Sequence, residues 1–261
     1  VATQIDNGGW TTPVQDGMIT SRVFWALVTA RDAGIPVEKS VFDKAAACLL
    51  KQLEGFDAND HDSRAIVLHA LATDKRADFA ACNRLYRDRQ SLGAATLAYL
   101  ARAFHHLGRA EVAAELAGIL ETKAVDAPGQ PVRWDSGCKV GWMNDSTEAT
   151  AIVLLALAES KPDSPRAAAA AQSLLHQRGC FGFPSARSRG PAVAALSAWF
   201  GMGKEQSTDM EIDVQVNGKA VGTTKATHRA GLTMIEVPRD LIAAGKNTIE
   251  FKMRGRGRFA W

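Results

Sequence analysis

Cysteine is scarce in this chain of 261 residues, and its spacing does not suit a metal site. Cys48, Cys82, Cys138 and Cys180 form no Cys-x-x-Cys pair, the spacing used by zinc ribbons, redox-active disulfides and iron–sulfur clusters. The sequence therefore predicts no metal, and nothing in it indicates a cofactor.

Long apolar runs and an excess of charge are also missing. No stretch approaches the roughly 20 apolar residues of a membrane span, so we expect no transmembrane segment. The net charge is only +3, and much of that excess lies in residues 252–258. Because no RNA-binding aromatic motif or groove helix accompanies this basic stretch, we expect a solvated edge and no nucleic-acid binding. The chain starts at Val1 without a signal-peptide pattern, and we expect it to be part of a longer protein.

Apolar residues recur at helical spacing from the N-terminal region to about residue 201. Val23, Leu27 and Ala30 repeat at i, i+4 and i+7, and Gly34 and Pro36 then end the helix. The connections are short and rich in Gly, Pro, Asp or Asn, so consecutive helices should be antiparallel neighbours. This reading predicts nine helices, over residues 18–33, 37–53, 63–73, 77–87, 91–107, 110–123, 146–160, 164–177 and 190–200.

Two kinds of helix alternate along this region. One kind is nearly continuous in Ala, Leu and Val, and the other carries more charged residues. A helix that is apolar over most of its circumference is buried on both sides, and its amphipathic partner then forms an outer layer. The pattern predicts a mainly α fold, either an α/α toroid of helical hairpins or an α-solenoid.

From residue 208 the pattern becomes alternating. Met210, Ile212, Val214 and Val216 alternate with polar residues, as in a half-buried strand, and a hairpin-type Asn-Gly pair follows at 217–218. Further strands are predicted at 221–227, 232–237 and 248–252, with a weak one at 259–261. Because this segment is too short for a comfortable sandwich, we expect a small antiparallel part of a β-sandwich. The predicted domains are 1–203 (toroid) and 204–261 (strands).

Two segments carry a resemblance to a known family. Residues 144–157 read Asn-Asp-Ser-Thr-Glu-Ala-Thr-Ala-Ile-Val-Leu-Leu-Ala-Leu, and residues 174–185 read Leu-Leu-His-Gln-Arg-Gly-Cys-Phe-Gly-Phe-Pro-Ser. They resemble the thioester-containing domain of the alpha-2-macroglobulin and complement family. Residues 4–10, Gln-Ile-Asp-Asn-Gly-Gly-Trp, resemble the turn that ends the family's preceding helix pair.

The resemblance implies an α/α toroid followed by later strands of a CUB- or macroglobulin-like β-sandwich domain. It also implies a parent protein outside the cytoplasm, periplasmic or secreted, that traps proteases or attaches covalently to surfaces. The partner would be a protease or another domain of the same parent chain. The family's Cys-Gly-Glu-Gln thioester motif is absent, so we expect a non-catalytic scaffold and docking portion, with no enzymatic activity of its own.

Two other readings stay open. The same ring architecture occurs in isoprenoid cyclases and protein prenyltransferases, whose Gln-x-x-x-Gly-x-Trp repeat residues 4–10 match once. The acidic residues Asp57, Asp60 and Asp62 have the wrong spacing for a cyclase motif, and no Asp, Cys and His set is spaced for zinc. A toroid used solely to bind protein is the third reading.

Candidate binding residues should gather at one mouth of the ring if the inner helices are parallel, because their N-termini then share one end. N-capping, with Asp145 or Ser146 as the cap, and aromatic plugging of the ring's end are the plainer explanation. His61, between two carboxylates, suits a general base or a solvated loop residue. The candidates are Trp10, Asp16, His61, Asp62, Trp142, Asn144, Glu148, Phe183 and Arg187.

Cys138 and Cys180 are a candidate disulfide. Cys138 precedes the predicted helix 146–160, and Cys180 follows its partner 164–177. An antiparallel hairpin brings both cysteines to the same end, where a disulfide requires Cα atoms within about 7 Å. Four free thiols are the alternative. Cys48 and Cys82 lie within helix patterns and should be buried thiols.

Overall fold

The computed structural model describes residues 3–10, 17–137, 144–179, 182–202, 209–227 and 233–256. The chain divides into two compact units, Val1–Phe200 and Gly201–Trp261. Helices make up the first unit, and the second is built on a small sheet. None of the helices within the described ranges is long and apolar enough to cross a membrane.

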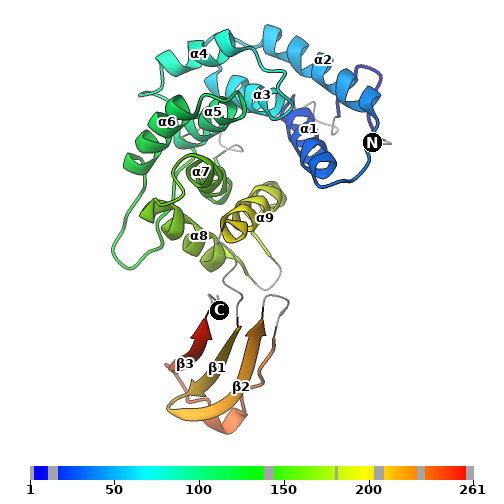
Figure 1. The fold of residues 1–261 in the computed structure, drawn as a ribbon. Coiled ribbons are helices and arrows are strands. Elements are labelled where there is room, and N and C mark those ends of the chain that lie inside the picture. The colour runs from blue at the N-terminus through cyan, green and yellow to red at the C-terminus, as the bar shows by residue number, and fades with distance from the viewer. Residues whose placement is uncertain are drawn as a thin grey trace. The chain divides into compact units, whose positions relative to one another are not determined.

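Helices of the first unit alternate between an inner and an outer row along an arc (Figure 1). Successive inner helices pack on one another from α1 through α3 and α5 to α7. The inner row is α1 (Gly17–Asp32), α3 (His61–Thr73), α5 (Ala94–His106), α7 (Ser146–Ser160) and α9 (Ala186–Gly201). The outer row is α2 (Lys39–Gly55), α4 (Phe79–Arg87), α6 (Ala110–Thr122) and α8 (Pro165–Gln177). The predicted mainly α fold of helical hairpins is confirmed.

Burial explains why the two kinds of helix occupy different rows. Every residue of α7 from 147 to 158 is buried, and the apolar ones are mostly alanine and leucine. Helix α4 buries only Ala81, Cys82 and Leu85, which share one face. Because an inner helix buries mostly apolar side chains around its whole circumference, it packs against both rows at once.

Trp134 holds the long connection between α6 and α7 against the core. Its ring is fully buried, and its indole N–H donates to the carbonyl of Leu120 at 2.7 Å. Its backbone N–H donates to the hydroxyl of Thr150 at 3.1 Å. Further along the connection, the Ser136 carbonyl accepts from the N–H of Ala95 at the start of α5. The connection therefore closes over the start of two inner helices.

The second unit contains β1 (Asp209–Val216), β2 (Lys219–Thr227) and β3 (Ile249–Arg256), in the antiparallel order β2-β1-β3. Alternate residues of β1, starting at Met210, are buried, as the alternation predicted. Asn217 and Gly218 join β1 to β2 with φ angles of 51° and 79°, both positive as a type I′ turn requires. That the sheet belongs to a larger sandwich stays a prediction.

One predicted strand is wrong. The described residues 233–237 are not a strand, and Met234 among them is 83% exposed. Ile235 packs against the apolar cluster on β1, which includes Ile212, so the segment contributes to the sheet's core without pairing at its edge. Alternation alone cannot distinguish these two arrangements. Residues 259–261 and Leu232 lie outside the described residues.

Candidate functional site

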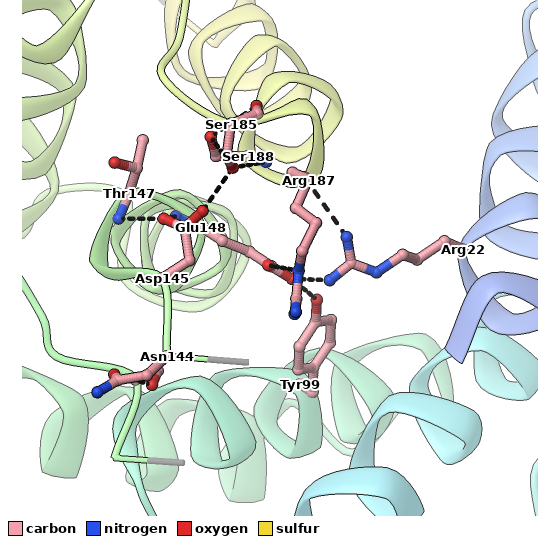
Figure 2. Close-up of polar contacts among 10 residues, drawn as sticks. Arg22, Tyr99, Asn144, Asp145, Thr147, Glu148, Ser185, Arg187 and Ser188 are labelled. Atoms are coloured by element: carbon pink, nitrogen blue, oxygen red, sulfur yellow. Dashed lines mark hydrogen bonds and ion pairs between the residues drawn. The ribbon is translucent and has the colours of Figure 1, made fainter. Parts of the chain in front are cut away.

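The buried carboxylate of Glu148 is the centre of the candidate site (Figure 2). Glu148 lies in the first turn of α7 and is 5% exposed. Its Oε1 accepts from the guanidinium of Arg22 on α1 and, at 3.2 Å, from the hydroxyl of Tyr99 on α5. Its Oε2 accepts from Nε of Arg187 on α9 at 3.1 Å. One carboxylate thus joins four inner helices, and these partners offset the cost of burying its charge.

A proline in α9 provides a second contact for Arg22. Pro191 lies inside α9 and has no N–H to donate to the carbonyl of Arg187 four residues earlier. Nη1 of Arg22 donates to that carbonyl at 3.4 Å. Arg22 therefore binds α9 both through Glu148 and through the backbone carbonyl to which Pro191 cannot donate.

Asp145 positions the starts of α7 and α9. Its Oδ1 accepts from the backbone N–H groups of Thr147 and Glu148 at 2.9 and 3.1 Å, which confirms the predicted N-cap. Its Oδ2 accepts from the hydroxyl of Ser185 at 2.6 Å. Ser185 Oγ in turn accepts from the N–H of Ser188 at 3.1 Å, within the first turn of α9.

A cavity of about 20 Å³ lies beside the Glu148 cluster. It has the volume for one water molecule, and its polar lining suits one. Asp62, at the start of α3, accepts from the hydroxyl of Thr96 at the start of α5. Ser136 Oγ donates to Oδ1 of Asn144 at 2.5 Å. The polar lining residues are Asp62, Thr96, Tyr99, Ser136, Asp145, Glu148 and Arg187.

The chemistry of the cluster is that of ion pairing and hydrogen bonding. Burial, together with the nearby Glu148 carboxylate, raises the pKa of Tyr99 well above its ordinary value, so its phenol remains a donor. The Ser185 hydroxyl is bonded to a carboxylate and lies beside Ser188, and no imidazole accepts from it in the described part of the chain. Within the same ranges, no group of three or more His, Cys, Asp or Glu side chains is placed to hold a metal ion.

The starts of α3, α5, α7 and α9 meet at one mouth, but only some of the residues predicted from the sequence lie there. Asp62, Glu148 and Arg187 line the small cavity, and Asn144 reaches it through Ser136. Whether these residues bind a partner stays a prediction.

The other candidates are separate from the cluster or are not described. Trp10 is buried in the core of α1, α2 and α3, where its backbone exchanges hydrogen bonds with the Thr20 hydroxyl. Phe183 is a core residue with 5% exposure. His61 Nε2 lies 3.8 Å from an oxygen of Asp88. Cys48 and Cys82 are free and buried, as predicted. Asp16, Trp142, Cys138 and Cys180 lie outside the described residues.

Sequence reasoning missed three partners in the cluster: Arg22, Tyr99 and Ser185. Arg22 and Tyr99 each interrupt a helix that is otherwise mostly apolar. A charged side chain in a helix destined for the inner row requires a partner, because such side chains are rarely buried unpaired. Polar residues inside the apolar helices were therefore the available signal.

Comparisons with known proteins identify the fold. No family model and no curated protein matches the sequence. Solved structures do match, among them Salmonella alpha-2-macroglobulin reacted with methylamine, with a TM-score of 0.62 and 16% identity. This chain has the fold of a segment of bacterial alpha-2-macroglobulin. The resemblance stated from the sequence is thus confirmed at the level of fold.

Two structures of Escherichia coli alpha-2-macroglobulin agree with this assignment. The crystal structure from domain MG7 to the C-terminus has a TM-score of 0.59 and 18% identity, and the native conformation by electron cryomicroscopy 0.59 and 16%. Each of the three matches covers 86% of this chain. The chain spans only 15%, 36% and 14% of the respective alpha-2-macroglobulin chains.

Proposed function

We propose that this chain is a non-catalytic scaffold and docking portion of an alpha-2-macroglobulin-like protein that acts outside the cytoplasm. The observation that carries the proposal is the fold likeness to bacterial alpha-2-macroglobulin over 86% of the chain. In this proposal the parent protein traps proteases or attaches to surfaces, and the helical arc positions and presents its binding surfaces. The partner is a protease or another domain of the same parent chain.

The pairing at the mouth supports a scaffold role. Both oxygens of Glu148 and both of Asp145 accept hydrogen bonds from groups of the chain itself. A general acid or base must exchange its proton with a substrate, whereas these carboxylates are used to hold helix ends together. The cluster therefore supports a positioning role.

A cleft beside the mouth supports a docking role. It has a volume of about 410 Å³ and lies between α1 and α9, with apolar side chains such as Val23, Trp25 and Pro191 in its lining. Arg22 and Arg187 border it, and their side chains remain 23% and 26% exposed. An apolar floor with a charged border is the usual anatomy of a protein interface.

The experiment uses the gene product that contains this segment and a purified endopeptidase. A trapped protease should lose activity on a large protein substrate and keep its activity on a small chromogenic peptide. Arg22→Glu together with Arg187→Glu reverses the charge at the border of the cleft and should weaken this selective inhibition. Arg89→Glu, in the turn that follows α4, is the matched control because it also breaks an Arg–Glu pair. If adding the gene product leaves the protease's activity unchanged on both the large and the small substrate, protease trapping is contradicted.

A further inference from the structure

A second polar cluster lies deeper in the inner row. His69 of α3 lies edge-on to Trp25 of α1, with ring centres 5.2 Å apart, and 5.9 Å from the ring of His106 of α5. The guanidinium of Arg102 lies over the Trp25 ring, 4.9 Å from its centre. Arg102 also makes a bidentate ion pair with Glu159 of α7, from Nε to Oε2 and from Nη2 to Oε1. These five side chains connect all four inner helices from α1 to α7. The ring of Tyr99, whose hydroxyl donates to Glu148 in the first cluster, lies 5.3 Å from the ring of His69.

Three buried nitrogen atoms in this cluster have no hydrogen-bond partner among the residues that the structure describes: Nε2 of His69, Nε2 of His106 and Nη1 of Arg102. His69 and Arg102 are only 1% and 4% exposed. Buried polar groups normally find partners, so this group is already unfavourable when both imidazoles are neutral. A proton added to either imidazole would place a second cation beside Arg102 with no new acceptor to receive it.

The charges around the histidine pair come from three helices. Arg102 and His105 of α5 disfavour a proton on His106, whereas Glu159 of α7 and Asp32 of α1 favour it. Burial outweighs them and lowers the pKa of His106 to about 4, and burial together with Arg102 lowers the pKa of His69 well below its ordinary value. Glu159 offers little relief, because its carboxylate is already bonded to Arg102.

Helix α1 is the element with room to move. It packs on α2 and α3, and Arg22 ties its first half to Glu148 of α7 and to the Arg187 carbonyl of α9. Beyond Arg22 its other side borders the 410 Å³ cleft toward α9. Trp25 lines that cleft and also contacts His69 and Arg102, so it separates the buried cluster from open space. A displacement of Trp25 into the cleft would let water reach the histidine pair.

We propose that the His69–His106 pair is an acid-sensitive switch that controls the packing of helix α1 on the inner row. Uptake of a proton by the pair beside Arg102 releases Trp25 and moves α1 toward the cleft. Folding lowers the affinity of these histidines for protons. The closed packing of α1 on the inner row is therefore stable at pH values above their ordinary pKa of about 6.5. It weakens as the pH falls below that value.

Hydrogen exchange of the chain, followed by mass spectrometry and corrected for intrinsic rates, tests this switch. Between about pH 7 and about pH 4.5, where ordinary exposed carboxylates remain mostly ionised, protection of α1 should fall about tenfold or more. Protection of α7 should change much less. In the double variant His69→Gln/His106→Gln the fall in α1 should disappear, whereas His176→Gln, which changes an exposed histidine of α8, should leave it unchanged.

Two further results decide the matter if the double variant does not fold. The double replacement Arg102→Met/Glu159→Met removes the cation that disfavours a proton on both histidines and the anion that favours one on His106. Because Arg102 has the larger effect, α1 should stay protected to lower pH. In the unaltered chain, histidine NMR signals should show the two buried imidazoles titrating together with the loss of α1 protection. An unchanged fall in the histidine variant, an unchanged profile in the Met variant, or simultaneous loss of protection in α1 and α7 would overturn the proposal.

Discussion

Replacing Glu148 by glutamine tests whether its carboxylate holds the inner helices together. Glutamine keeps the shape of the side chain but removes the charge that faces two guanidinium groups. Removing one partner of a buried ion pair typically costs about 3–5 kcal/mol. The side chains of Arg22 and Arg187 are 23% and 26% exposed, so water partly solvates them once the anion is gone. We therefore expect a loss of about 2–3 kcal/mol.

The chain offers a matched control on the outer row. Glu115 accepts from the hydroxyl of Tyr86 and from Arg89, the same kinds of donor that surround Glu148, but its side chain is 45% exposed. An exposed pair of this kind contributes about 0–1 kcal/mol, so Glu115→Gln should cost no more than that. The two variants thus compare the same kinds of contact at a buried glutamate and at an exposed one.

Urea unfolding followed by far-ultraviolet circular dichroism measures the difference. With a slope of about 2–3 kcal/mol per molar urea, Glu148→Gln should lower the midpoint by about 1 M. In the double variant Glu148→Gln/Arg187→Gln the loss should be smaller than the sum of the single losses, because the two side chains are in direct contact. A midpoint shift no larger than that of Glu115→Gln would refute the role assigned to Glu148.

Three further predictions concern backbone geometry, core packing and chemistry. Gly8 and Gly34 have nearly equal φ angles, 88° and 86°, but an added Cβ meets the carbonyl of Lys44 at 2.3 Å only at Gly8. Gly34→Ala should therefore lower the free energy of unfolding in urea by about 1–2 kcal/mol, and Gly8→Ala should lower it by about 1–3 kcal/mol more. Equal losses would contradict the close approach between residue 8 and the Lys44 carbonyl. Trp134→Phe removes the indole N–H that donates to the Leu120 carbonyl at 2.7 Å, so it should lower the free energy of unfolding, measured by thermal unfolding, by about 2–4 kcal/mol. The control is Trp199→Phe, at a half-buried position, which should lower it by less than about 1 kcal/mol. Because the sequence contains no Cys-x-Glu-Gln, methylamine should add no mass to the chain, and a stoichiometric adduct seen by mass spectrometry would disprove this.

The sequence by itself determined the elements and their layers. Alanine-rich apolar helices alternate with amphipathic ones in the sequence. The helices that are apolar around most of their circumference are buried on all sides and form the inner row, whereas the amphipathic ones bury one face and form the outer row. Local rules were also sufficient for the Asp145 cap and for the Asn217-Gly218 turn, because each depends on contacts within a few residues. The prediction of a strand at 232–237 was wrong, because a strand also needs a distant strand to pair with, and local alternation does not show whether there is one.

Only the tertiary structure decided the partners of the polar residues. Arg22 lies 126 residues from Glu148 in the sequence, and no local pattern links them. Their contact arises because the inner helices bring their N-terminal halves together at one mouth, where Arg22 also donates to the Arg187 carbonyl, to which Pro191 cannot donate. His69 and His106 likewise look like ordinary helix residues until burial brings them together beside Arg102. Ion pairing and desolvation depend on distances through space, and for residues this far apart in the chain only the packing of the helices sets those distances.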